Sequence, residues 1–404
     1  MTAHRETEHK SIRLGEVLEE LDFKHSTFEQ RQEHIKNMLA RYLNLRTVVA
    51  LIGSGASIPL GYPSWTGFAK NTLEHASKFI TDEDYPGTGI IRNYLSYLKN
   101  ERGNELSAQV MLGECERFWG EYIARLRKGG NGKKLESFRD SIKNAFEKVH
   151  KQFPQTVPVN GKSMSYKDKL DAEHNPYLAL LKLPIKRFIT TNYDLEIERG
   201  ILIKKHASYS LQVGEIGNAS TQNIIEWTKG KSFSQSENYC DELAKFPLAR
   251  FDGNEDMVFH CHGRIDEIDS CIVTEKDYQQ WYLKEDPASL PFRQALDLTL
   301  SSNPILIIGY GLGDVDLMRW LRMITANRPE DRVRNPLFCI NYISQNMYVK
   351  KWGGDNDLIK AECDALYQKY GLHVIPIYEP KTRGNTLCQA LFDIAQRWKD
   401  WWDG

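Results

Sequence analysis

Six short runs of apolar, largely β-branched residues recur along this chain, separated by long polar or helical stretches. Each run has the length of a strand that is buried on both faces, as in a parallel sheet. Helical patterns stand between most of the runs, and this alternation predicts a doubly wound α/β sheet. The runs are Val48–Ile52, Phe188–Thr191, Met257–His260, Ile305–Ile308, Leu337–Ile340 and Val374–Ile377.

The uneven spacing of these runs predicts two insertions into one α/β domain at 47–380. The segment at about 66–183 has helical patterns and is expected to be a helical insertion. The segment at about 201–255 is polar and weakly periodic, and we expect it to be rich in loops.

Both ends of the chain are expected to be helical, with an N-terminal arm at 1–46 and a C-terminal helix at 381–404. Ser26 and Glu29 have the spacing of a capping box that would open a helix running to about Leu45. The C-terminal pattern places one apolar face on the last helix. This face either packs on the chain's own core or forms an interface with a subunit or partner. Its members are Leu391, Ile394, Ala395, Trp398 and Trp402.

Composition limits the classes of function. The formal net charge of −1 argues against strong direct binding of nucleic acid. The 7 cysteines include no C-x-x-C pair, so we expect neither a disulfide framework nor a zinc module, and no bound metal. The N-terminus lacks an apolar signal region and no apolar stretch is long enough to span a membrane, which predicts a cytoplasmic protein.

A glycine-rich turn follows the first apolar run directly. A strand that enters such a turn presents backbone N–H groups to an anion, typically a pyrophosphate. Ile58 stands where a complete dinucleotide motif has its third glycine, and no Lys-Ser/Thr pair follows, which excludes a P-loop NTPase at this site. A structural turn without a ligand is the alternative. The turn consists of Gly53, Ser54, Gly55, Ala56 and Ser57.

Polar groups also follow four of the other runs, where ligands of open α/β sheets bind. Thr191, Asn192 and Asp194 follow the second run, and either Asn192 meets a ligand or Asp194 caps the next helix. The third run leads into His260-Cys261-His262-Gly263, and a histidine here suits a general base. Two histidines and a cysteine also raise the possibility of zinc, but no second pair of ligands has suitable spacing.

The last two of these clusters are a glycine turn and an asparagine. Gly309, Tyr310 and Gly311 would allow a ligand to approach the backbone closely. Asn341 follows the fifth run and suits contact with a ribose or adenine, or it forms a turn.

Taken in order, GSGAS…GYPSW, TTNYD, HCHG, IGYGLGD and CIN resemble the motif series of the sirtuin superfamily. More specifically, they resemble the sirtuin-like NAD hydrolases of bacterial antiphage defence. The resemblance covers roughly 45–70, 185–200, 255–320 and 335–380. It implies a sirtuin-like, Rossmann-type parallel sheet that binds NAD+ as a substrate.

The resemblance also implies roles for individual residues. Asn192 and His262 match the catalytic asparagine and histidine, and Asp194 is a candidate contact of the nicotinamide carboxamide. Residues 53–57 would line the pyrophosphate, and Thr191 would lie near the nicotinamide ribose. The turn at 309–311 and Asn341 would lie beside the adenosine.

The chain departs from the family's deacylases at two places. Ser64-Trp65-Thr66 replaces their Asp-Phe-Arg, and their four-cysteine zinc module has no counterpart here. Deacylation is therefore disfavoured, and Trp65 is expected to shield the nicotinamide side of the site. The resulting hypothesis is hydrolysis of NAD+ to nicotinamide and ADP-ribose by an abortive-infection effector.

Three alternatives to hydrolysis remain at this point. One is an NAD-dependent protein deacylase or ADP-ribosyltransferase, and another is a subunit that binds NAD or ADP-ribose without chemistry. The third is a nucleic-acid-processing subunit, for which the charged loop from Arg125 to Lys134 is the one hint, although such a loop is more often a solvated surface. The resemblance further implies a homo-oligomer and, as a possible partner, a HerA-type hexameric ATPase.

Overall fold

The computed structural model describes much of the chain between Thr27 and Asp403, and the elements below lie in its described parts. These parts are 27–80, 88–100, 106–128, 137–151, 157–159, 162–164, 172–206, 224, 226, 231–235, 240–247, 256–283, 287–310, 318, 321–322, 335–343, 356–378 and 383–403. Residues 1–26 of the arm expected at 1–46, and the predicted site residue Gly311, lie outside them.

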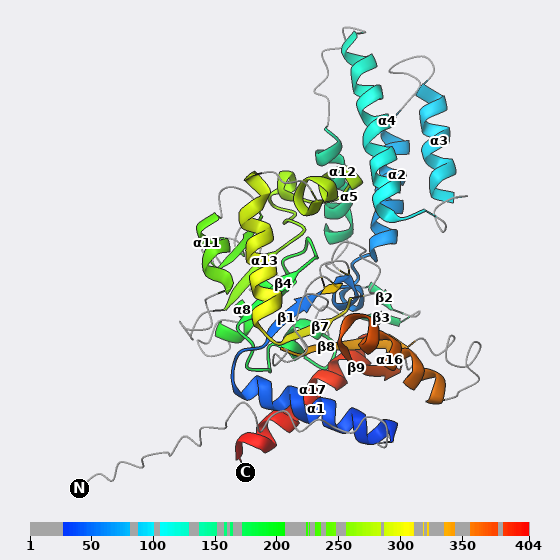
Figure 1. Cartoon of the computed structure of the whole chain (residues 1–404). Helices are drawn as coiled ribbons and strands as arrows, with labels where there is room; N and C mark the ends of the chain where they lie inside the picture. Colours follow the sequence, from blue (N-terminus) through cyan, green and yellow to red (C-terminus); the bar gives the residue numbers. More distant parts are fainter. Residues whose placement is uncertain are drawn as a thin grey trace.

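A seven-stranded sheet forms the centre of the molecule (Figure 1), and each pair of neighbouring strands runs parallel. The predicted parallel α/β sheet is therefore confirmed. The strands follow the order β5 (Ser232–Ser234), β6 (Met257–His260), β4 (Arg187–Thr190), β1 (Val49–Ile52), β7 (Ile305–Ile308), β8 (Leu337–Ile343) and β9 (Leu372–Tyr378).

The central strand β1 is the switch point of this sheet. After β1 the chain forms β4 on one side, and after β6 it returns to form β7 on the other side. In open α/β sheets, ligands bind beyond the carboxyl ends of the strands at such a switch point. The glycine-rich turn begins at this end of β1, because Gly53 follows Ile52 directly.

Alternate residues of the strands enter two different cores, as the two-residue period of a strand requires. Ala50 and Ile52 pack into one core with Phe188, whereas Val49 and Leu51 pack into the other. Both faces are therefore buried, which explains why each strand is a continuous apolar run.

Helices cover both faces of the sheet (Figure 1). On one face α1 (Phe28–Asn44) and α17 (Arg383–Asp403) pack on each other and on β9, and α17 also packs on α7 (Pro176–Leu180). The other core takes residues from α11 (Cys240–Lys245), α12 (Glu275–Tyr278), α13 (Leu290–Ser302) and α16 (Asn356–Tyr370). The helix α8 (Glu196–His206) follows β4 and packs on α7.

The segment between β1 and β4 holds four longer helices and a small hairpin. Helices α2, α3 and α4 stand together away from the sheet at the top of Figure 1, and α5 packs on α2 and α4. The sequence patterns did not predict the hairpin β2–β3, and the domain boundaries stay a prediction. The bounds are α2 Trp65–Phe79, α3 Thr88–Asn100, α4 Ala108–Lys128, α5 Phe138–Lys151, β2 Val157–Val159 and β3 Lys162–Met164.

The capping box of α1 lies one residue later than predicted. Thr27, not Ser26, is the N-cap, and its hydroxyl accepts from the Gln30 backbone while the Gln30 side chain accepts from Thr27 N–H. Both pairs have the required i, i+3 spacing, so the pattern alone did not distinguish them.

The C-terminal helix packs on the chain's own core through the predicted face. Leu391, Ile394 and Ala395 are buried, and Trp398 packs against the same core. For these residues the structure thus agrees with packing on the chain's own core, the first of the two interpretations of this face. Among the helices of the described ranges, none combines the length and the apolar character needed to cross a membrane.

Candidate active site

Two glycine turns pack against each other at the carboxyl end of β1. Gly53 N–H donates to Ile308 O at 2.9 Å, and Gly55 N–H donates to Gly309 O at 2.7 Å. A Cβ on Gly53 or Gly55 would lie 2.7 Å from the Gly309 oxygen, closer than atoms can approach. The glycines are therefore required by contact between the turns, so their presence alone does not demonstrate a ligand.

The side chain of Asn192 is fixed by three acceptors from three parts of the chain. Its Nδ2 carries two hydrogens and faces Gly53 O at 3.1 Å, Ser57 Oγ at 2.9 Å and Tyr177 OH at 2.9 Å, so two of these acceptors share one hydrogen. A main-chain carbonyl can only accept, so the atom facing Gly53 is the amide nitrogen. Among the described residues no hydrogen bond engages Oδ1, which leaves this oxygen as the acceptor that Asn192 can offer to a ligand.

A chain of hydroxyls connects Asn192 to a buried carboxylate. Ser57 Oγ donates to Asp194 Oδ2 at 2.8 Å and lies 2.6 Å from Tyr177 OH. Either hydroxyl can donate in the contact between Ser57 and Tyr177, and Tyr177 OH also lies 3.5 Å from Asp194 Oδ1. In both arrangements one of the two hydroxyls donates to the Asp194 carboxylate.

Asp194 also holds the first residue of the helix that follows β4, α8. Its Oδ1 accepts from Glu196 N–H at 3.1 Å, as expected for the capping alternative. Burial, and after it the negative charge of Glu196, raises the pKa of Asp194 to about 6 from its ordinary 3.8. Hydrogen bonds from Ser57 and from Glu196 N–H act in the opposite direction. At neutral pH this carboxyl is therefore mainly ionised, and it accepts protons readily in mild acid.

Replacing Asp194 with Asn is expected to make stability less dependent on pH. In the wild type the folded state binds the Asp194 proton more tightly than the unfolded chain, so stability falls as pH rises from 3.8 to about 6. Above that window, the raised pKa of Asp194 lowers the free energy of unfolding of the wild type by about 3 kcal/mol. Chemical denaturation at several pH values should show that the free energy of unfolding of Asp194→Asn increases relative to that of the wild type as pH rises. If the difference between the two proteins does not change with pH, the raised pKa of Asp194 is contradicted.

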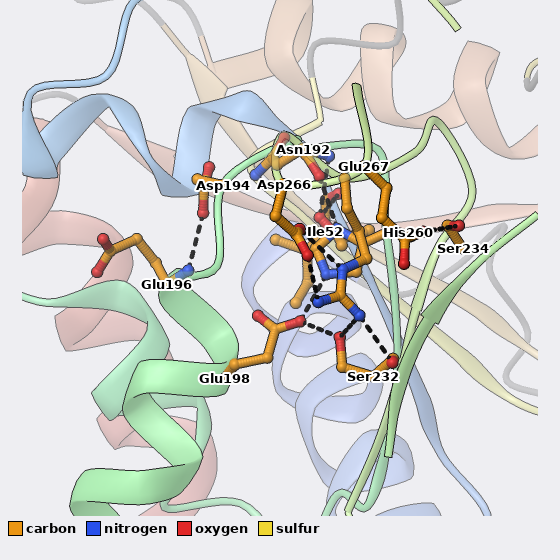
Figure 2. A network of polar contacts seen from close by, with 12 residues as sticks. Ile52, Asn192, Asp194, Glu196, Glu198, Ser232, Ser234, His260, Asp266 and Glu267 are labelled. Carbon is orange, nitrogen blue, oxygen red and sulfur yellow. Dashed lines mark hydrogen bonds and ion pairs between the residues drawn. The ribbon is translucent and has the colours of Figure 1, made fainter. Parts of the chain in front are cut away.

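A fully buried pair of a histidine and a carboxylate lies behind the Asn192 main chain (Figure 2). His260 Nδ1 lies 3.0 Å from Asn192 O, and its Nε2 lies 2.6 Å from Glu198 Oε1. Ser232 Oγ donates to the same Glu198 oxygen at 2.5 Å. Burial alone raises the pKa of Glu198, but the His260 charge and these hydrogen bonds lower it below its ordinary value. Glu198 is therefore ionised at neutral pH.

The segment carrying His262 runs alongside the segment carrying Asn192. Cys261 N–H donates to Thr190 O at 2.9 Å, and Ile265 N–H donates to Tyr193 O at 3.1 Å. Thr190 and His260 are paired in the sheet, so Asn192 and His262 each lie two residues beyond a paired position. The two predicted catalytic residues thus leave the sheet side by side.

The ring of His262 is held by two tyrosines. It packs edge-on against Tyr278 and Tyr282 at centroid distances of 5.3 and 6.0 Å, and Nδ1 lies 3.4 Å from Tyr278 OH. The insertion helix α5 supports the adjoining segment, because Arg139 donates to Cys271 O and pairs with Asp277.

The other predicted ligand contacts are partly assembled around this centre. Trp65 lies against Tyr193 at a centroid distance of 5.8 Å, and Thr191 N–H donates to Ile52 O at 3.0 Å. Tyr310 follows Gly309 directly in the second glycine turn. Asn341 lies inside β8, paired with Pro376, and so does not follow the end of its strand as predicted. Strand β8 extends to Ile343 because its polar residue still pairs with β9.

Three residues of this arrangement were not singled out from the sequence. Tyr177 reaches Ser57 across 120 positions, and no motif marks it. Glu198 had a detectable signal, since a carboxylate within the apolar stretch of α8 needs a buried partner. His260 stood in the HCHG motif, but the pattern did not distinguish its role from that of His262.

Metal ligation finds no support in this arrangement. Both ring nitrogens of His260 are engaged, by Asn192 O and by Glu198. Within the described ranges no group of three or more His, Cys, Asp or Glu side chains could hold a metal ion. The expectation that the chain binds no metal stays a prediction.

Comparison with known proteins agrees with this fold and site. Residues 186–375 match the family described as the SIR2-like domain, which spans β4 to β9 and includes Asn192, Asp194 and His262. Residues 186–375 therefore resemble that family, in agreement with the predicted sirtuin-like fold. The glycine turn after β1 and Tyr177 lie before the matched residues.

A comparison with a curated protein makes this resemblance more specific. The chain is 27% identical over 177 residues to the NAD(+) hydrolase ThsA of Enterococcus faecium. The aligned part makes up 44% of this chain and 29% of that protein, so the chain corresponds to less than a third of its relative's length.

Proposed function

We propose that this chain is an NAD+ glycohydrolase that cleaves NAD+ to nicotinamide and ADP-ribose. The observation that carries the proposal is the fixed amide of Asn192 at the switch point of the sheet. Its nitrogen is committed to Gly53, Ser57 and Tyr177, so the carbonyl oxygen is the atom aimed at substrate. The name of the similar NAD(+) hydrolase supports the same reaction.

Cleavage of the bond between C1′ of the ribose and the nicotinamide nitrogen develops positive charge on the ribose. The electron pair of the breaking bond passes to the nicotinamide nitrogen, and water forms the new bond to C1′. Asn192 Oδ1 accepts a hydrogen bond from a ribose hydroxyl or from the attacking water and so fixes the reacting atoms. His262 takes the proton released by water, as a general base, and passes it to solvent.

Trp65 gives this site a wall on the side of Tyr193. It is the first residue of α2 and packs on Phe68 and Tyr193 at centroid distances of 5.6 and 5.8 Å. We assign it the role of excluding bulk water from the nicotinamide side. Residues 53–57, Thr191, Gly309, Tyr310 and Asn341 contact the rest of NAD+ in this proposal.

The biological setting proposed for this activity is abortive infection in bacterial antiphage defence, within the cytoplasm. Depleting NAD+ halts metabolism, so the activity must be restrained until infection. Assembly into a homo-oligomer, with a HerA-type ATPase as a possible partner, offers that restraint. The support for this setting is the resemblance of the motif series.

The test is chromatography of NAD+ incubated with the purified protein, alone and with the product of a neighbouring gene. Equal amounts of nicotinamide and ADP-ribose are expected from the wild type, and none from Asn192→Ala. Release of nicotinamide only when an acylated or target peptide is added would favour the deacylase or transferase alternative. Binding of NAD+ or ADP-ribose without turnover in either condition would favour a sensing subunit.

A further inference from the structure

We infer that the buried pair His260–Glu198 positions Asn192 for catalysis by holding its main-chain carbonyl; this role rests on the proposed NAD+ hydrolysis. Both side chains are fully buried, with an exposure of 0%, so neither touches substrate. Their effect must therefore pass through Asn192.

Three groups of Asn192 are held in place: its side chain, its backbone N–H and its backbone carbonyl. The side chain is held by Gly53, Ser57 and Tyr177, and the backbone N–H donates to Thr190 Oγ1 at 3.0 Å. The backbone carbonyl is held by His260 Nδ1 at 3.0 Å. Because Asn192 lies two residues beyond the end of β4, outside the ladder of the sheet, the contact on its carbonyl sets the direction in which the amide points.

Glu198 determines which ring nitrogen of His260 faces Asn192. A carbonyl can only accept, so Nδ1 must carry a hydrogen. The contact between Nε2 and Glu198 Oε1, at 2.6 Å, fixes the ring in this orientation. Without the carboxylate, the ring could take the other tautomer and release the Asn192 carbonyl.

The pair is itself anchored from the edge of the sheet (Figure 2). Ser232 in β5 donates to Glu198, and Arg264 Nη1 donates to Ser232 O at 2.8 Å. Arg264 in turn forms two hydrogen bonds with Asp266, at 3.0 and 2.9 Å. The edge strand β5, which lies in the stretch expected to be loop-rich, thus reaches Asn192 through a continuous series of contacts.

Two amide substitutions separate the two contacts of His260. In His260→Asn the amide nitrogen can replace Nδ1 and keep the contact with Asn192 O. In His260→Gln it can replace Nε2 and keep the contact with Glu198 while losing Asn192. Each variant is also made with Glu198→Gln, because a neutral partner beside a buried carboxylate destabilises the fold.

The comparison uses the chain with Glu198 or with Glu198→Gln, whichever folds. There, His260→Gln is expected to have a kcat for NAD+ cleavage about 3- to 10-fold below that of His260→Asn, because it lacks one hydrogen bond to Asn192. KM should be the same in both, because neither group touches NAD+. The pair His373→Asn and His373→Gln, at a histidine of β9 packed on Phe338 and Tyr367, serves as the control and should show no difference. Equal kcat for the two His260 variants would overturn the assignment.

A second measurement does not depend on activity. The carbonyl carbon of Asn192, labelled with carbon-13 and assigned by the loss of its NMR signal in Asn192→Ala, should shift in His260→Gln and keep its position in His260→Asn. A wild type that never cleaves NAD+ defeats the proposed function but leaves this contact measurable. An unchanged carbon shift in His260→Gln defeats the positioning role, whatever the activity.

Discussion

Replacing His262 with Ala is expected to lower kcat for NAD+ cleavage by about 10²- to 10⁴-fold, the range for removal of a general acid or base. The ring is only 5% exposed and lies against Tyr278 and Tyr282, so its orientation is defined before substrate binds. The chain segment that carries it is hydrogen-bonded to the segment that carries Asn192. The loss should therefore appear in turnover and leave NAD+ binding nearly intact.

The measurement is initial-rate chromatography of nicotinamide, with NAD+ affinity determined separately by calorimetry. His34→Ala is a matched control, because His34 is half-buried on α1, a helix that packs on β9 and α17. It should keep wild-type turnover. If His262→Ala is folded and cleaves NAD+ at the wild-type rate, His262 is not the base. The catalytic role that the family resemblance implied for this residue is then wrong.

The sequence was most informative where a strand is buried on both faces. Strands β6 and β7 have the predicted bounds, Met257–His260 and Ile305–Ile308, because a continuous apolar run has no other stable position in this fold. Strand β5 escaped prediction because Ser232-Phe233-Ser234 alternates polar and apolar residues within a polar stretch. Its two serines are buried through contacts with Glu198 and Glu267, which a sequence pattern does not encode.

Within the site, local motifs could be predicted but their long-range connections could not. Asn192 and His262 stand beside recognisable strand ends, whereas Tyr177 is marked by nothing in its own neighbourhood. The glycines illustrate the same limit, since the motif predicted approach of a ligand and the structure shows approach of a second turn. Both explanations require a missing side chain, so the residue type alone could not separate them.

Replacing Gly309 with Ala is expected to lower the free energy of unfolding by about 3 kcal/mol or more and to abolish NAD+ cleavage. Gly309 has φ +61°, and a Cβ there would lie 2.3 Å from the backbone nitrogen of Ala56. Backbone atoms cannot move aside as the end of a side chain can, so the turn at 53–57 must shift. That turn supplies Gly53 O and Ser57 Oγ to Asn192, and the amide would lose both acceptors.

Gly113→Ala provides the matched control, because Gly113 lies within α4 and a Cβ there meets nothing within 4 Å. This substitution should raise stability by up to about 1 kcal/mol, since alanine favours the helix over glycine, and should leave cleavage unchanged. Chemical denaturation of both variants shows whether Gly309→Ala lowers stability and Gly113→Ala raises it. Nicotinamide release shows which of the two still cleaves NAD+. A Gly309→Ala protein as stable and active as the wild type would mean that the two turns separate easily, and the glycines after β1 would then have to be explained by the ligand alone.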